Sequence, residues 1–310
     1  ISNLLNGIES EQGNISFDKQ FEQLYSLNFN SSGSELNSSQ VKLDWWTNDA
    51  NGEAVEFVFK ANPSSKEQII LLNSGSGNRH VWDLRLIPSS SNTQHSKIEF
   101  RLSNVTEPTG SLVNNAVSMS TDYLDNLSNN KLWNVVLQRM TSSTNANITQ
   151  SYQMLVGFQD GDKIKNYNSI SMSLNEPHSI AHSASNFNFV GNGNMSSAES
   201  GNLIVGRTLS GSISEFRVWN EALSGSKFKQ HILSKKNNIG NNLRSSIDNL
   251  IYRFRFNENY NLNSNNVKII DSNPNTIKDY SRYLYVNPIN YSVDKITSYK
   301  FSTTANYTDN

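Results

Sequence analysis

Gly211-Ser-Ile-Ser-Glu-Phe-Arg-Val-Trp-Asn-Glu-Ala-Leu-Ser224 is the stretch of sequence that decides the fold. Its apolar residues alternate, but Ile213 is odd-numbered whereas Phe216 and Val218 are even-numbered. Alternate residues of a strand point to opposite faces, so one buried face cannot hold all three side chains in a regular strand. The change of phase therefore predicts a β-bulge at the two residues between them.

A short amphipathic helix is expected directly after this stretch. Ser224 or Ser226 can cap it, because a serine hydroxyl accepts a hydrogen bond from an amide of the first turn. Phe228 and Ile232 are four residues apart and share one helical face. Gly240 is the predicted end of the helix.

Outward from this stretch, short segments of alternating apolar and polar residues recur along the chain. Each such segment is typical of a strand with one buried face. A tight hairpin is predicted at Asp160-Gly161, a favoured dipeptide for two-residue turns. Many short strands with turns between them favour an antiparallel sandwich or barrel. The predicted strands lie within residues 55–59, 69–72, 82–86, 98–102, 133–137, 152–158, 203–205, 252–256 and 267–271.

Composition excludes several classes of protein. The 310 residues carry a formal net charge of -1, so no overall field attracts nucleic acid or a membrane surface. The chain has no cysteine, which excludes disulfides and thiolate metal sites. It has no apolar run of membrane-spanning length. A first residue Ile1, with no leader-like sequence after it, suggests a fragment or a processed chain.

The closing stretch resembles the last strand and turn of laminin G-like, concanavalin A-like domains, which follow a G-x-I-x-x-hydrophobic-R-hydrophobic-W/Y-N-x-x-L-S pattern. Segments 53–60, 68–73, 131–139 and 154–164 resemble earlier strands of that family, in the family's order. The resemblance implies an all-β, two-sheet antiparallel jelly roll with one short helix. It implies a lead-in at 1–14, the jelly roll at 15–236, and a β-rich extension or the start of a following domain at 237–310.

Two further segments, 226–233 and 250–259, are similar to virion structural proteins of marine T4-like phages, such as cyanophages. That resemblance implies a non-enzymatic module of a virion, in a tail, fibre or decoration protein. Its partners would be other virion proteins, copies of itself or a host-surface carbohydrate, with neither nucleic acid nor membrane insertion. Two alternatives stay open: a polysaccharide-degrading enzyme of the same fold, and a secreted bacterial adhesin.

Paired catalytic acids are not evident in the sequence. Glycoside hydrolases of concanavalin A-like fold carry Glu-x-Asp-x-x-Glu on one strand, and the nearest match here is Glu53-Ala-Val-Glu56. Residues three apart in a strand point to opposite faces, so Glu53 and Glu56 cannot flank one glycosidic bond. Both are predicted to be exposed strand acids. His178 and His182 have the spacing of a helical metal pair but lie in loop-like sequence, so a loop role is favoured.

Calcium is the cofactor that the resemblance suggests, because related domains often hold it at a loop rim. Calcium requires six to eight oxygen ligands. Asp160 and Asp162 are the candidate ligands, with Asp122, Asp125 and Glu199 as further oxygen donors. A simple hairpin role for the first two is the alternative.

A carbohydrate platform is predicted at Trp45-Trp46. Adjacent strand residues point to opposite faces, so one of these two rings is a candidate for sugar contact, with packing under the C-terminal segment as the alternative. Trp82 and Trp133 are expected in the core, and Trp219 beneath the helix.

The segment after the helix carries aromatic residues that need a surface to cover. We expect a strand at 250–256 packed on the sandwich, and the remainder leading towards a partner or a following domain. Segment 237–310 is too short for an ordinary core of its own, so its deletion is expected to expose apolar surface and cause aggregation. These aromatic residues include Tyr252, Phe254, Phe256, Tyr280, Tyr283 and Tyr285.

Overall fold

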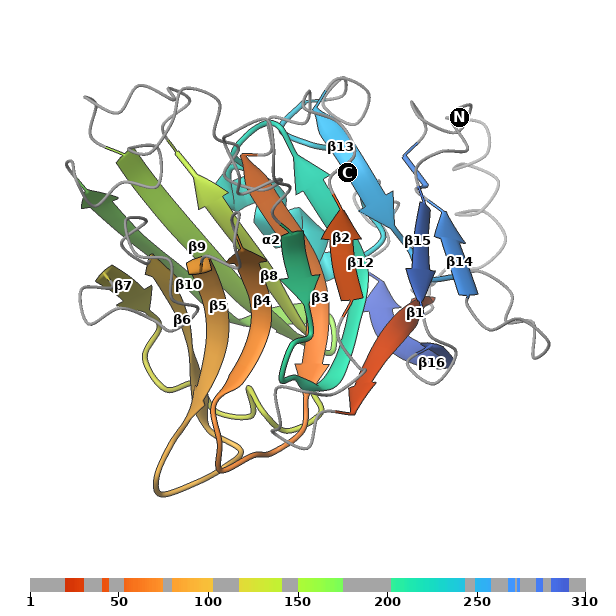
Figure 1. The fold of residues 1–310 in the computed structure, drawn as a ribbon. Coiled ribbons are helices and arrows are strands. Elements are labelled where there is room, and N and C mark those ends of the chain that lie inside the picture. Colours follow the sequence, from red (N-terminus) through yellow and green to blue (C-terminus); the bar gives the residue numbers. More distant parts are fainter. Residues whose placement is uncertain are drawn as a thin grey trace, which may run out of the picture.

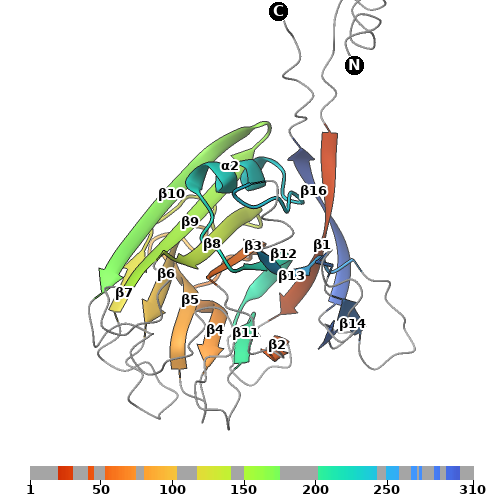
Figure 2. The ribbon, with the colours of Figure 1, turned by 90° about the horizontal axis from the view of Figure 1, so that it is seen from above.

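Two antiparallel sheets pack against each other, with one helix on the outer side of the larger sheet (Figures 1 and 2). The computed structural model describes residues 20–30, 41–44, 53–74, 80–102, 117–140, 150–174, 202–242, 249–257, 267–270, 272–273, 283–286 and 291–300. Within these ranges, no helix is both long enough and apolar enough to cross a membrane.

The larger sheet has eight strands, all paired antiparallel. β13 (Leu250–Phe254) lies beside β12 and off the main order. The main order is β10 (Lys163–Leu174), β9 (Gln150–Asp160), β8 (Trp133–Arg139), β3 (Ala54–Ala61), β12 (Ser210–Trp219), β1 (Gln20–Asn30) and β16 (Tyr291–Lys300).

The smaller sheet has six strands, and a separate ladder joins β14 (Val267–Ile270) to β15 (Tyr283–Val286). The eight-stranded and six-stranded sheets, both antiparallel, confirm the predicted two-sheet sandwich. The order of the six strands is β2 (Val41–Asp44), β11 (Asn202–Val205), β4 (Gln68–Ser74), β5 (His80–Pro88), β6 (Ser96–Leu102) and β7 (Val117–Ser120).

The core lies between the two sheets and follows the alternation of the sequence. Phe57 and Phe59 of β3 point into it from the larger sheet, and Trp82 of β5 enters from the smaller one. Trp133 stacks on Phe158 with ring centroids 4.9 Å apart. All but Phe158 are fully buried, and each buried aromatic side chain contributes roughly 2 to 3 kcal/mol of transfer free energy. The expected core positions of Trp82 and Trp133 are confirmed.

The predicted β-bulge is present in β12 and marks a change of partner strand. The register of β12 with β3 shifts between Ser214 and Arg217, and Glu215 has a φ of 46°. On the opposite edge of β12, residues before the bulge pair with β1 and residues after it pair with β13. The bulge thus lies where β1 and β13 follow each other along one edge of β12, and the Glu215 side chain contacts Arg253 of β13.

The C-terminal segment supplies strands to the larger sheet. The strand expected at 250–256 is β13, and its Tyr252 and Phe254, with Phe256 just beyond it, are buried in the main core. β16 pairs with β1 along the far edge. The division of the chain at residue 236 stays a prediction.

Helix α2 (Gly225–Leu233) covers part of the outer face of the larger sheet (Figure 2). Ser224 caps it by accepting a hydrogen bond from the amide of Lys227 at 3.3 Å, as expected. The predicted end at Gly240 is wrong. Ser234 already has an extended backbone, and its amide closes the last turn on the Gln230 carbonyl.

Close packing of α2 on the sheet depends on a glycine in β9. A Cβ atom at Gly157 would lie 2.0 Å from Ile232 Cδ1, closer than any real contact. Phe228 and Ile232 share the buried face of the helix, as predicted. They pack in one cluster with Leu155 of β9 and Trp219 of β12. The expected position of Trp219 beneath the helix is confirmed.

Candidate functional site

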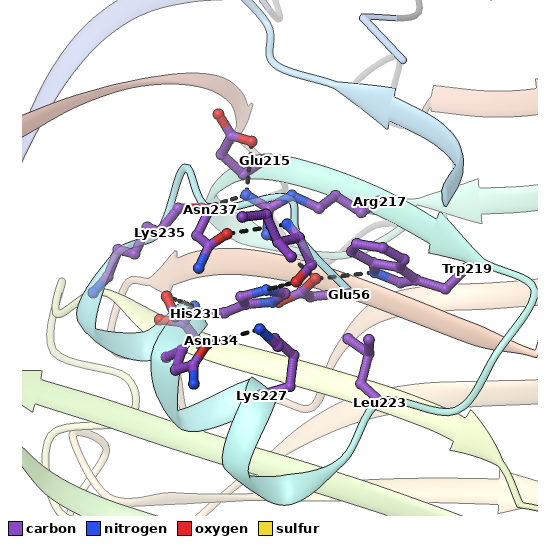
Figure 3. A network of polar contacts seen from close by, with 12 residues as sticks. Glu56, Asn134, Glu215, Arg217, Trp219, Leu223, Lys227, His231, Lys235 and Asn237 are labelled. Carbon is purple, nitrogen blue, oxygen red and sulfur yellow. Dashed lines mark hydrogen bonds and ion pairs between the residues drawn. The ribbon is translucent and has the colours of Figure 1, made fainter. Parts of the chain in front are cut away.

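A network of buried charged side chains lies between β12 and helix α2 (Figure 3). Glu56 of β3 is fully buried, and its Oε2 lies 3.2 Å from Nη1 of the equally buried Arg217. Trp219 Nε1 donates to the same oxygen at 3.0 Å. The prediction that Glu56 is an exposed acid is therefore wrong, because α2 covers that face of β3 and side chains of the neighbouring strand β12 surround the carboxylate.

Glu53 does not join this network, and its side chain, which was predicted to be exposed, is mostly buried. Its carboxylate accepts hydrogen bonds from Arg139 Nε and Nη2 at 2.7 and 2.6 Å. Glu56 lies among the residues under α2, whereas Val55 and Phe57 face the inner core. The two glutamates are separated, as predicted, and no acid pair forms between them.

His231 of helix α2 joins the network from above. Its Nδ1 lies 2.7 Å from Glu56 Oε1, and its Nε2 lies 2.9 Å from the carbonyl oxygen of Ile239. Both partners accept hydrogen bonds, so the ring satisfies both only when each nitrogen carries a proton. The ring also stacks on Trp219, with centroids 6.1 Å apart.

Glu215, at the bulge, holds the second half of the network. Its Oε2 accepts from Arg217 Nη2 at 2.8 Å and from Arg253 Nε of β13 at 3.1 Å. The same two guanidinium groups donate to backbone carbonyls just beyond α2, Arg217 to Lys235 and Arg253 to Lys236. One network thus ties β3, β12, β13 and the end of α2 together.

Electrostatics keep the central pair charged. Burial alone would raise the pKa of Glu56, but the charges of His231 and Arg217 and the hydrogen bonds from His231 and Trp219 lower it to about 2. Burial would likewise lower the pKa of Arg217, but Glu56 and Glu215 raise it above its ordinary value. A carboxyl with a lowered pKa is a poor general acid, and the group is out of reach of solvent. The network is therefore structural.

Acid is expected to weaken the fold through Glu56. Its native pKa lies below the unfolded value of 4.5, so its stabilising contribution is complete above about pH 4.5 and is lost as the pH falls towards 2. The difference between the native and unfolded pKa values corresponds to roughly 3 kcal/mol of folding free energy. Urea unfolding from pH 6 to pH 2 measures it. A Glu56→Gln variant should show a shallower pH dependence, whereas Glu67→Gln, at a half-exposed side chain, should not. Equal slopes in both variants would refute the assignment to Glu56.

A row of uncharged polar side chains, exposed on β10 and half-buried on β9, lies beside α2 on the same outer face. We call Ser151, Gln153, Ser169, Ser171 and Ser173 the polar strip. The serines of β10 alternate with Ile170 and Met172, which pack towards the core, so their hydroxyls point outward. In the register of β9 with β10, Ser173 is opposite Ser151 and Ser171 is opposite Gln153.

Hydrogen bonds link the polar strip across the two strands. Ser151 Oγ and Ser173 Oγ are 2.9 Å apart, and Gln153 Nε2 donates to Ser169 Oγ at 3.2 Å. Gln138 of β8, which is buried, donates to Gln153 Oε1 at 2.7 Å. The strip is thus a pre-arranged array of groups that both donate and accept, on rigid strands rather than loops.

Gln138 also fixes the segment that leads into α2. Its Oε1 accepts from the Leu223 amide at 2.8 Å, and its Nε2 donates to the Leu223 carbonyl at 3.0 Å. One side chain therefore connects the polar strip with the start of the helix.

The outer face of the six-stranded sheet is charged rather than neutral. Arg85 of β5 binds Asp83 through Nε and Nη2 at 2.7 and 2.5 Å, and Glu67 through Nη1 at 2.7 Å. On β6, Glu99 lies between Lys97 and Arg101 at 3.4 and 2.5 Å. These charges pair with one another, which leaves little of their bonding capacity for a ligand.

Of the residues predicted to bind ligand or metal, Asp160 and Asp162 lie in the β9–β10 hairpin, while Trp45 and Trp46 are outside the described residues. The loop between the strands is Gly161-Asp162, with a φ of 64° at Gly161, so the predicted hairpin is confirmed. Asp160 pairs with Lys165 at 3.3 Å.

No group of three or more potential metal ligands (histidine, aspartate or glutamate) forms within the described ranges. Asp125 of the further oxygen donors lies 3.3 Å from His95, and Glu199, His178 and His182 are outside the described residues. Calcium binding at Asp160 and Asp162 stays a prediction.

Sequence reasoning missed the buried network and the polar strip. The signals were present: Glu56, Arg217 and Arg253 are charged residues inside otherwise apolar strands. In β10, the run Ser169-Ile-Ser-Met-Ser173 alternates small hydroxyl residues with apolar ones.

Comparison with known proteins identifies no family. No family model matches the sequence, and no curated protein matches it. A putative carbohydrate binding protein from Bacteroides ovatus is 11% identical, with a TM-score of 0.42 over 91% of this chain and 61% of that one. The CBM40 of the Ruminococcus gnavus IT-sialidase, bound to α2,3-sialyllactose, is 10% identical, with a TM-score of 0.38 over 66% and 95%.

A phage protein is also among the similar structures. The enzymatically active domain of tailspike protein 2 from bacteriophage CBA120 is 13% identical, with a TM-score of 0.41 over 79% of this chain and 34% of that one. These similar structures include carbohydrate-binding and phage proteins, and both a binding module and an enzyme. Likenesses this distant assign neither a ligand nor an activity to the present chain.

Proposed function

We propose that the chain is a non-enzymatic, saccharide-contacting module of a phage particle. The observation that carries the binding part of this proposal is the polar strip. A saccharide surface consists largely of hydroxyl groups, and serine hydroxyls and a glutamine amide can donate to and accept from such groups. The strip presents them uncharged and held by strand pairing, with the three serines of β10 exposed, so little ordering is required when a ligand binds.

The state of the carboxylates supports a binding role over hydrolysis. Glycoside hydrolysis requires two carboxyl groups roughly 5–10 Å apart across the sugar, one of them with a raised pKa. Among the described residues, Glu53, Glu56, Asp83, Glu99 and Glu215 are each paired with a basic side chain. The pKa of Glu56 is lowered, the opposite of what a general acid requires.

The virion part of the proposal rests on the resemblance of segments 226–233 and 250–259 to phage structural proteins. These segments cover α2 except for its first residue, and all of β13, and the buried network holds the two elements together. Other virion proteins or copies of the chain are the proposed partners. Mass spectrometry of purified phage particles tests whether the protein is part of the virion. If the gene that encodes the chain lies among bacterial surface genes instead of phage genes, the adhesin alternative is favoured.

Binding is tested with a panel of algal and cyanobacterial polysaccharides, measured by calorimetry. We expect at least one polysaccharide to bind, and the triple variant Ser169→Ala, Ser171→Ala, Ser173→Ala to bind it at least about tenfold more weakly, since each of the three lost hydrogen bonds costs about 0.5 to 1.5 kcal/mol. Ser118→Ala, an exposed serine of β7 on the other sheet, is the matched control. Unchanged affinity in the triple variant would place the binding site elsewhere.

The enzyme alternative has its own test on the same panel. Incubation with each polysaccharide should release neither reducing ends nor unsaturated uronates. Clear turnover, abolished by replacing an acidic residue, would establish an enzyme and overturn this proposal.

A further inference from the structure

One exposed cation is held in a fixed place at the end of the polar strip. Lys229 of α2 has its Nζ 4.4 Å from the centroid of the Tyr167 ring. Tyr167 precedes Ser169 on the outer face of β10, so the ammonium group continues the line of the strip. Within the described ranges, Lys229 has no carboxylate partner, whereas Lys165, on β10 with Tyr167, pairs with Asp160.

The ring beneath this cation is firmly packed. Tyr167 lies against Phe228 of the helix with centroids 6.3 Å apart, and a Cβ at Gly225 would come within 2.6 Å of its Oη. Burial raises the pKa of the Tyr167 phenol, while a hydrogen bond with Ser169 lowers it less, so the ring stays neutral at physiological pH. A neutral aromatic face attracts an ammonium group and restricts where it sits.

We propose that Lys229 recognises the anionic group of an acidic saccharide whose hydroxyl groups lie along the polar strip. The inference rests on the proposed function of the strip. The ligand class is an oligosaccharide with a carboxylate or sulfate group. Strand geometry places Tyr167 and Ser173 roughly 20 Å apart, longer than one sugar ring. An ammonium group gives an anion one strong, charge-assisted contact that a neutral sugar cannot make.

The same helix provides a matched control. Lys227 is two residues away, and its Nζ donates to Gln230 Oε1 at 2.8 Å instead of lying over Tyr167. Lys227→Gln and Lys229→Gln remove the same charge from the same helix, and only Lys229→Gln removes the cation that lies over Tyr167. Lys229→Arg retains the charge and its attraction to the ring.

The experiment measures the affinity of three oligosaccharides of equal length, by calorimetry at two salt concentrations: a glucuronate oligomer, a sulfated glucose oligomer and a neutral glucose oligomer. We expect the acidic oligomers to bind more tightly than the neutral one, and less tightly in high salt. Lys229→Gln should lower the acidic affinities about five- to tenfold more than the neutral affinity. Lys229→Arg should restore most of the loss, and Lys227→Gln should cause little. Whichever of the two acidic oligomers binds more tightly identifies carboxylate or sulfate as the preferred anion.

Three outcomes would overturn the inference. If the acidic oligomers bind no more tightly than the neutral one, or if Lys227→Gln and Lys229→Gln have equal effects, Lys229 does not select an anion, while binding at the strip still stands. If the acidic oligomers bind but the triple serine variant does not weaken them, the strip is not the site, and both proposals fail together. Circular dichroism of each variant verifies that the helix is intact.

Discussion

A chain shortened to end at residue 248 is expected to aggregate or unfold, whereas a chain that ends at residue 257 should keep a cooperatively folded sandwich. The two differ by little more than β13. That strand brings Tyr252 and Phe254 into the main core, with Phe256 just beyond it. Each buried aromatic side chain contributes about 2 to 3 kcal/mol, and the three together approach the total stability of an ordinary domain.

Loss of β13 also leaves its partners incomplete. One edge of β12 after the bulge loses its ladder, and Glu215 loses Arg253. Unpaired edges and exposed apolar surface favour aggregation. Size-exclusion chromatography and thermal unfolding compare the two chains. If the shorter chain is monomeric, soluble and as heat-stable as the longer one, β13 is a tether and not part of the core.

Replacement of Arg217 by methionine is expected to destabilise the protein by about 3 to 5 kcal/mol, because Glu56 and Glu215 would keep buried charges without their common partner. Urea unfolding at neutral pH measures the change. The end of α2 should loosen as well, since Arg217 donates to the Lys235 carbonyl. Faster amide exchange in α2 would show this.

Two comparisons make the Arg217 result specific. Arg101→Met removes an ion pair with Glu99 from the outer face of the smaller sheet, where the arginine is partly exposed, and should cost less than about 1 kcal/mol. The double variant Glu56→Leu with Arg217→Met should be less destabilised than Arg217→Met alone, because one uncompensated charge is gone. A loss for Arg217→Met no larger than for Arg101→Met would contradict the structural role of the network.

The strands and the bulge could be predicted because their signals are local. Alternation within a strand places Phe57 and Phe59 inward regardless of the partner strands, and the phase change after Ile213 reveals the bulge within a few residues. The cap of α2 at Ser224 is equally local. Its end at Leu233 was not predictable, because the backbone carbonyls beyond it are held by Arg217 and Arg253 from distant strands.

The sites depend on contacts between residues far apart in the chain. His231 meets Glu56 only because β12 pairs with β3 and α2 folds back over both strands. Glu56 looks exposed in its own sequence segment, since nothing nearby indicates a covering helix. The polar strip needs the register of β9 with β10 to bring Gln153 beside Ser169.

The most direct test of saccharide binding is a map of amide chemical shifts in the isotope-labelled protein, titrated with oligosaccharides from the polysaccharide that binds in the panel. We predict that the shifts that change cluster at residues 151–153 and 167–173, on one face of β9 and β10. Shifts confined to the outer face of the smaller sheet, around residues 83–85 and 97–101, or no shifts with any oligosaccharide, would contradict the assignment of the polar strip as the binding surface.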